Sequence, residues 1–120
     1  MPKSLVLGNG SILVSLDFRG QVRDFYFPFV GLENQSEGCL HRVGFWVDGE
    51  FSWLDNPEWQ ISIDYQKETL ASKITAFNER LRIEAFFLDA VYNEKNIFIR
   101  SVRVKNTASK KRTVRIFFCQ

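Results

Sequence analysis

Acidic side chains are the first candidates for chemistry in this sequence, because paired carboxylates at about 5 to 9.5 Å perform general acid–base work in sugar hydrolysis. Nine of them fall along expected turns and alternating strands: Asp17, Asp24, Glu33, Glu37, Asp48, Glu50, Asp55, Glu58 and Glu68. Their spacing forces no two of them together, and solvated surface acids are commonplace. We therefore expect no catalytic residue in this chain and no enzyme activity from it alone.

The other polar residues predict neither a metal site nor a cofactor. His41 is the only histidine, which excludes a site built on two imidazoles. Cys39 and His41 offer two ligands without a second pair nearby, so we expect a loop residue held by hydrogen bonds. Residues 8–11 are rich in glycine but lack the helix that a phosphate-binding loop needs, and they predict a turn.

Three tryptophans offer another route to function, since Trp46, Trp53 and Trp59 lie within fourteen positions. Sugar rings stack on indole faces, so these side chains are candidates for a carbohydrate-binding platform or a domain contact. The alternative is that at least two of them fill the core. The sequence leaves both interpretations open.

The segment 25–35 fits neither a core strand nor a simple turn. It is apolar and aromatic, holds a proline and a glycine, and leads into polar residues. A loop of this kind is costly to leave in water, so we expect it to pack on another surface. A flap over the core of its own domain is the alternative.

These residues must be positioned by β-strands, because the dominant apolar period is two. Nine strands are expected, over residues 11–17, 22–27, 42–47, 51–54, 59–65, 72–78, 81–90, 97–105 and 112–118. Gly20 and the pair Asp48-Gly49 predict tight hairpins. Short strands with Asn-rich joints favour an all-β, antiparallel β-sandwich. Phe86 and Leu88 lie opposite Ala85 and Phe87 in the pattern, which predicts strands covered on both faces.

Composition and charge exclude several classes of protein. The 120 residues are 45% apolar and 25% charged, which is typical of one folded domain over residues 1–120. Sixteen Lys and Arg against fourteen Asp and Glu give a net charge of +2, too little to indicate a nucleic-acid partner. No stretch approaches the ~18 apolar residues of a membrane span, and the apolar start is too short for a signal peptide. We therefore expect a cytoplasmic protein.

The last residues, 113–120, run through a strand pattern without a closing turn or a polar tail. Natural domains usually end in polar, exposed residues. The pattern predicts an incomplete half of a larger domain, with a strand edge or an apolar face left unmatched. Self-association of the chain through that surface is expected.

Several stretches resemble, in order, one known domain. They are residues 7–11, the Phe25-Tyr26-Phe27-Pro28 stretch with Gly31 and Glu33-Asn34, and residues 43–49, 51–54, 89–91 and 102–106. Together they resemble the N-terminal β-sandwich, or supersandwich, domain of prokaryotic glucoamylase-like enzymes. This is glycoside hydrolase family fifteen, which includes glucodextranases and some trehalases.

The resemblance implies a modular hydrolase. In that family the sandwich packs against an (α/α)6 barrel, which holds both catalytic glutamates and inverts an α-glucosidic bond. The barrel is not in this sequence, so its catalytic pair transfers to no residue here. The expected partners are the barrel of the same parent chain and, through it, an α-glucan or α-glucosyl disaccharide. A stand-alone carbohydrate-binding module that uses the tryptophans is the alternative.

The resemblance also implies a position for one loop. Tyr26, Pro28, Gly31 and Asn34 match the order of residues in a family loop that approaches the mouth of the active site. Gln35 stands where the family often has His, which argues against proton transfer but leaves shape and hydrogen bonding.

Overall fold

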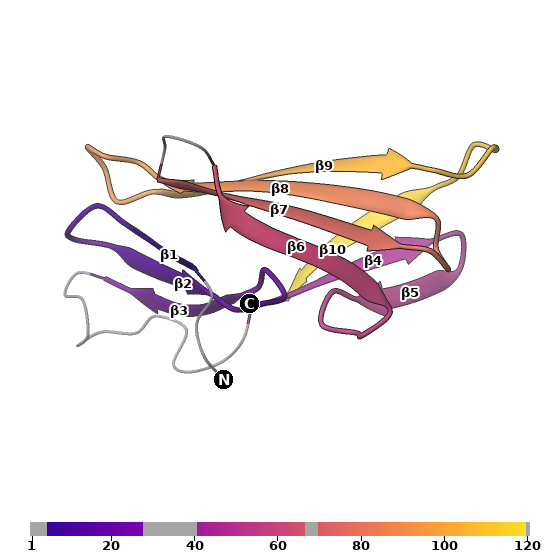
Figure 1. Ribbon diagram of the computed structural model, residues 1–120, viewed down its shortest axis with the longest axis horizontal. Coiled ribbons are helices and arrows are strands. Elements are labelled where there is room, and N and C mark those ends of the chain that lie inside the picture. Colours follow the sequence, from indigo (N-terminus) through magenta and orange to yellow (C-terminus); the bar gives the residue numbers. More distant parts are fainter. Residues whose placement is uncertain (1–4, 28–40, 67–69, 120) are drawn as a thin grey trace.

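The computed structural model describes residues 5–27, 41–66 and 70–119, and in these ranges the chain forms ten β-strands and no helix (Figure 1). The strands are β1 (Leu5–Gly8), β2 (Leu13–Leu16), β3 (Val22–Tyr26), β4 (Arg42–Val47), β5 (Glu50–Trp53), β6 (Trp59–Tyr65), β7 (Ala71–Asn78), β8 (Ile83–Val91), β9 (Phe98–Asn106) and β10 (Val114–Cys119). In the same ranges no helix is long and apolar enough to cross a membrane.

The strands form three antiparallel sheets in two layers. One layer is the four-stranded sheet β6-β7-β8-β9, and the other contains the three-stranded sheets β1-β2-β3 and β10-β4-β5. A bridge between Val22 and His41 connects the two smaller sheets. The predicted all-β, antiparallel sandwich is confirmed.

Two hairpins have the turns that the sequence predicts. Gly20 lies between β2 and β3 with a φ of 73°, in the left-handed region that glycine favours. Asp48 and Gly49 join β4 to β5 with φ values of 46° and 92°, as a two-residue turn of this hand requires. The strand β1 was not expected. It pairs with β2 from Leu5↔Leu16 to Gly8↔Leu13, and its four residues are too few to show alternation.

The core lies between the two layers and is built from alternate residues of each strand. Ile12, Val14 and Leu16 are almost fully buried, as the period of two predicts. At the centre, the Phe45 ring of β4 lies 5.1 Å from the Trp59 ring of β6 and 6.5 Å from the Phe87 ring of β8. These aromatic contacts connect the two layers.

The prediction that β8 is covered on both faces is wrong. Ala85 and Phe87 are buried, but Phe86 is only half-buried and Leu88 is 43% exposed. On this outer face Phe86 pairs across the strands with Thr75 and Arg103, and Leu88 pairs with Lys73 and Ser101. Long polar side chains beside the two apolar residues make a mixed outer surface, and no described element packs over it.

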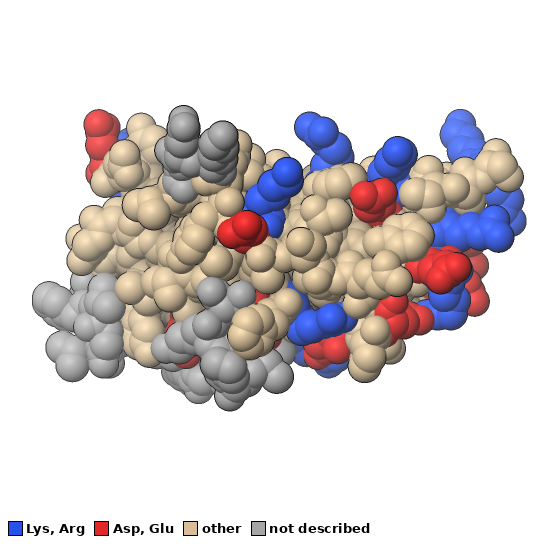
Figure 2. Space-filling model, viewed as in Figure 1, with Lys and Arg blue, Asp and Glu red and all other residues tan. Residues whose placement is uncertain are grey.

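Charged side chains are unevenly distributed over the surface. Figure 2 shows Lys, Arg, Asp and Glu concentrated toward the end of the molecule where the β4–β5, β7–β8 and β9–β10 connections lie. The visible surface toward the opposite end carries few charges. The candidate surface described below belongs to the sheet β10-β4-β5, which reaches the charged end.

Candidate interaction surface

The structure separates the three tryptophans. Trp59 is 2% exposed and belongs to the core, where its Nε1–H donates a hydrogen bond to Ser52 Oγ at 2.9 Å. Trp46 and Trp53 are half-buried on the outer side of β4 and β5. One of the three side chains therefore fills the core, fewer than the two that the alternative interpretation required, and the other two are available for a surface contact.

Trp46 and Trp53 are part of a larger aromatic group that the sequence alone did not indicate. The register sets Trp46 opposite Phe51 on β5, and Gly44 opposite both Trp53 and Phe117 of β10. Phe51 contacts Trp53 edge-on at 4.8 Å and Phe117 at 5.7 Å between ring centroids. Six outward side chains of this sheet are called the aromatic face below: Arg42, Trp46, Phe51, Trp53, Arg115 and Phe117.

Two arginines of the aromatic face cover its tryptophans. The guanidinium of Arg42 lies 4.1 Å from the Trp53 ring centroid, and that of Arg115 lies 4.9 Å from the Trp46 ring centroid. Arg42 also forms an ion pair with Asp55 at 3.3 Å. Cation–π contacts of this kind occupy the ring faces that a sugar would need for stacking. A sugar would have to displace the guanidinium groups first.

The turn between β4 and β5 explains how the sequence builds this face. A two-residue turn fixes the register of a hairpin, and the register decides which side chains share a face. With Asp48-Gly49 as the turn, Trp46 and Phe51 must be cross-strand neighbours. The signal for Phe51 was therefore present in the sequence. Arg115 and Phe117 carried no such signal, because β10 reaches β4 from far along the chain.

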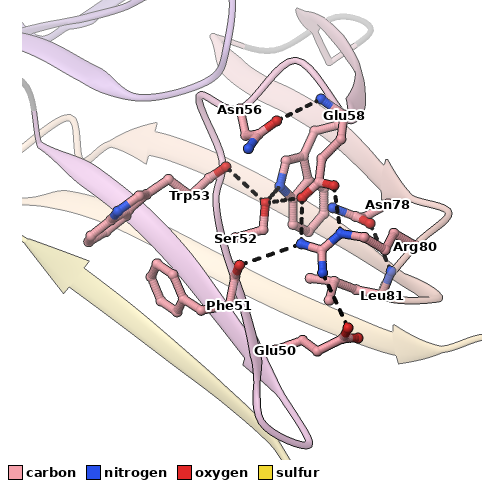
Figure 3. Close-up of polar contacts among 10 residues, drawn as sticks. Glu50, Phe51, Ser52, Trp53, Asn56, Glu58, Asn78, Arg80 and Leu81 are labelled. Carbon is pink, nitrogen blue, oxygen red and sulfur yellow. Dashed lines mark hydrogen bonds and ion pairs between the residues drawn. The ribbon is translucent and has the colours of Figure 1, made fainter.

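A polar network lies at the edge of β5 and fixes its position (Figure 3). The guanidinium of Arg80 donates to both carboxylate oxygens of Glu58 at 2.8 and 2.9 Å, and Ser52 Oγ donates to the same carboxylate. Arg80 also lies 3.6 Å from Glu50. The network connects β5 and the turn after it to the β7–β8 turn, and through Ser52 it reaches the Trp59 indole.

Glu58 is unsuited to act as a general acid. The hydrogen bonds from Arg80, followed by the one from Ser52, lower the pKa of Glu58 from its ordinary 4.5 to about 2. An acid catalyst must hold its proton near the working pH, which requires a raised pKa. Glu58 is ionised at neutral pH, and its role is to hold Arg80 and Ser52.

Two buried carboxylates also have structural partners. Asp89 is fully buried and accepts two hydrogen bonds from Arg100, at 2.8 and 2.9 Å, and one from Ser72. Asp17 accepts hydrogen bonds from the backbone N–H groups of Arg19 and Gln21 in the β2–β3 turn. Within residues 5–27, 41–66 and 70–119, no three His, Cys, Asp or Glu side chains are grouped to hold a metal ion.

A cavity of about 330 Å³ lies between the two layers. Its lining includes His41, Phe98, Arg100 and Phe118. Burial, and next the positive charge of Arg100, lower the pKa of His41 below its ordinary 6.5. The Arg100 guanidinium is already bound to Asp89 and to the Gly20 carbonyl, at 2.6 Å from the latter. The lining therefore combines the His41 imidazole and apolar side chains with the guanidinium groups of Arg42 and Arg100.

The loop expected to border a substrate cleft falls largely outside the described residues. Pro28, Gly31 and Asn34 are not among them. Tyr26 is half-buried at the end of β3, where it pairs with Leu13. The assignment of these four residues to a cleft stays a prediction.

Comparison with known proteins gives one similarity. No family model matches the sequence, and no solved structure is a significant match. Over 113 residues the chain is 26% identical to a protein of Methanocaldococcus jannaschii that is named an uncharacterized glycosyl hydrolase. The match covers 94% of this chain but only 18% of that protein, so the chain spans less than a fifth of its relative. This similarity supports a domain related to a glycosyl hydrolase, without distinguishing family fifteen from other families.

Proposed function

We propose that this chain is a non-catalytic, cytoplasmic β-sandwich domain of a glycosyl hydrolase that acts on α-glucosidic bonds. In this proposal it packs against a catalytic (α/α)6 barrel, supports the fold of the barrel and borders its substrate cleft. The observation that carries the proposal is the extent of the similarity. Nearly the whole chain matches a glycosyl hydrolase, yet the match leaves most of that protein uncovered.

The chemistry of the described carboxylates supports a non-catalytic role. Glu58, Asp89 and Asp17 are each held by arginine or backbone donors in structural networks. The pKa of Glu58 is shifted downward, to about 2. Hydrolysis of a glycoside needs a carboxylic acid with a raised pKa and a second carboxylate nearby.

The aromatic face is the surface we assign to the barrel. It combines four aromatic side chains with two arginines, and aromatic residues and arginine are enriched where proteins contact each other. Stacked guanidinium groups keep free N–H donors at the ring edges, which suits a partner surface with carboxylates or carbonyls. The covered ring faces favour this interpretation over the carbohydrate-binding module.

The proposal is tested by activity and by exchange of domains. The chain alone is assayed with maltose, isomaltose and trehalose, and we expect no turnover. The matching 113 residues of the M. jannaschii protein are then deleted, or replaced by this chain, and soluble yield and glucosidase activity are measured. We expect the deletion to lose both and the chimera to recover part of both. Turnover by the chain alone, or a deletion without effect, would overturn the proposal.

Matched variants of the chimera test the assigned surface. Trp53→Ala with Phe117→Ser removes two aromatic side chains from the aromatic face. Leu88→Ser is the control, because Leu88 is similarly exposed on the outer face of the other sheet. We expect the first variant to lose the recovered yield and activity and the control to keep them. If Leu88→Ser instead loses yield and activity while the first variant keeps them, the contact with the barrel lies on the outer face of the four-stranded sheet.

A further inference from the structure

The strand β10 has one free edge. It pairs with β4 in the order β10-β4-β5, and no described strand pairs with its other side. The backbone N–H of Asp48 donates to the Thr113 carbonyl at 3.2 Å, so the backbone groups of Thr113 point toward β4. Because the backbone groups of successive residues point to opposite sides of a strand, those of Val114, Ile116 and Phe118 face outward from the sheet.

Two other sheet edges are protected by side chains, as is common in natural β proteins. On β1, the Tyr65 hydroxyl accepts a hydrogen bond from Val6 N–H at 3.1 Å and donates one to the Val6 carbonyl at 3.0 Å. On β5, Arg80 donates to the Phe51 carbonyl at 3.5 Å. In contrast, no described side chain hydrogen-bonds to the backbone of residues 114–119.

The free edge of β10 also carries exposed apolar side chains on both faces. Ile116 and Phe118 on the inner side are 36% and 51% exposed, and Phe117 on the aromatic face is 45% exposed. An edge strand with free backbone groups and exposed apolar side chains is a template for pairing with another strand.

The sequence of β10 is complementary to itself in antiparallel pairing. With Ile116 opposite Ile116 of a second copy, Val114 lies opposite Phe118 on the inner side. On the aromatic face, Arg115 of each copy lies opposite Phe117 of the other copy. These neighbours can form cation–π contacts, and no two arginines lie opposite each other. Centring the pair on Arg115 would set two arginines against each other, which is unfavourable. The register centred on Ile116 pairs all three residues whose backbone groups point to the free edge, and it forms about six backbone hydrogen bonds.

We propose that β10 pairs with β10 of a second copy of this chain, about a two-fold axis through Ile116. The pairing joins the two three-stranded sheets edge to edge into one continuous sheet. The two aromatic faces then lie side by side on the same side of that sheet. This proposal concerns the chain itself and does not depend on a catalytic partner.

The first test is the oligomeric state of the full chain, measured by sedimentation velocity from micromolar to millimolar concentration. We expect a monomer–dimer equilibrium with a dissociation constant in this range. Ile116→Pro removes an N–H that faces away from β4, so the existing ladder keeps its bonds. We expect this variant to weaken the dimer at least ~tenfold. A wild-type chain that stays monomeric throughout would overturn the proposal.

Val102→Pro is the matched control. Tyr92 N–H donates to the Ile97 carbonyl, so by alternation the N–H of Val102 faces the free edge of β9. Val102 is half-buried on the inner face of its sheet, and Ile116 lies on the inner face with an exposed fraction of 36%. We expect Val102→Pro to dimerise as the wild type does, and circular dichroism verifies that both proline variants are folded. If both prolines, or neither, weaken the dimer, β10 is not the interface.

Charge variants test the register without proline. Phe117→Glu sets a glutamate opposite Arg115 of the other copy on both sides of the axis, so we expect the dimer to be kept or tightened. Adding Arg115→Glu sets glutamate opposite glutamate, and we expect at least a ~tenfold loss of affinity. Non-specific apolar association predicts weakening by Phe117→Glu alone, and that result would overturn the assigned register.

Discussion

The ring of Phe51 lies directly over Gly44, across the strand pair β4–β5. A Cβ atom at position 44 would overlap the tip of the Phe51 ring and would lie 2.9 Å from Trp53 Cε3. Real Cβ atoms do not approach other atoms this closely. The aromatic face is therefore flat at its centre because residue 44 has no side chain, and Phe51 can reach Phe117 across β4.

Replacing Gly44 by alanine is expected to destabilise the fold. The added methyl group must displace the rings of Phe51 and Trp53, and overpacking of this kind costs about 1–3 kcal/mol. Urea unfolding followed by tryptophan fluorescence measures the loss. An unchanged midpoint would show that the two rings move aside freely.

A double-mutant cycle supplies the control for that variant. Phe51→Ala removes the ring that the new Cβ would meet first. We expect Gly44→Ala to cost clearly less in the Phe51→Ala background than in the wild type, since contacting residues couple. Additive effects would place the strain elsewhere.

Stability is expected to fall in acid because of Glu58. Its pKa in the folded chain is about 2, below the ordinary 4.5, so the charged form stabilises the fold above pH 4.5. That contribution is lost as the pH falls from 4.5 toward 2. We expect about 1 kcal/mol after allowance for solvent screening. Unfolding free energies of wild type and Glu58→Gln, measured at several pH values, should converge over this window.

Glu50→Gln is the comparison for the acid titration. Glu50 contacts the same guanidinium, but at 3.6 Å and with a side chain that is 60% exposed. Exposed ion pairs contribute little, so its pH profile should follow the wild type. If the free energy of unfolding of Glu50→Gln varied with pH as that of Glu58→Gln does, any carboxylate near Arg80 would account for the effect, and the hydrogen bonds of Glu58 would not be its cause.

The buried pair Asp89–Arg100 is expected to matter far more than the exposed pair Arg42–Asp55. Asp89→Ala leaves the largely buried guanidinium of Arg100 with the Gly20 carbonyl as its remaining hydrogen-bond acceptor and without a neutralising charge, and losses of about 3–5 kcal/mol are typical of such a change. Asp55→Ala removes a partner that is 34% exposed and should cost no more than about 1 kcal/mol. Thermal unfolding of both variants gives the comparison.

Local patterns predicted most of the strands because each depends on neighbouring residues. The Asp48-Gly49 turn fixes a register by itself, and Trp59–Tyr65 begins and ends where the sequence predicts. The exposed face of β8 was misjudged, because period two shows which residues share a face but not whether another layer covers it.

The aromatic face could be predicted only in part for the same reason. Phe51 follows from the hairpin, whereas Phe117 and Arg115 come to β4 by a pairing between residues about seventy positions apart. No local rule sets such a pairing. The stacking of Arg42 on Trp53 depends on side-chain geometry that no sequence pattern records.

The last prediction concerns sugar binding by the two outer tryptophans. Since Arg42 and Arg115 cover the ring faces of Trp53 and Trp46, we expect calorimetry with a maltooligosaccharide to show weak or no binding by the wild type. Removing both guanidinium groups in Arg42→Ala with Arg115→Ala uncovers the rings and should increase any binding, and a further Trp53→Ala should abolish the gain. A wild-type dissociation constant below ~100 µM, about −5.5 kcal/mol, would instead favour the carbohydrate-binding module. In that case the arginines would be ligands of the sugar hydroxyls, and Arg42→Ala would weaken binding rather than strengthen it.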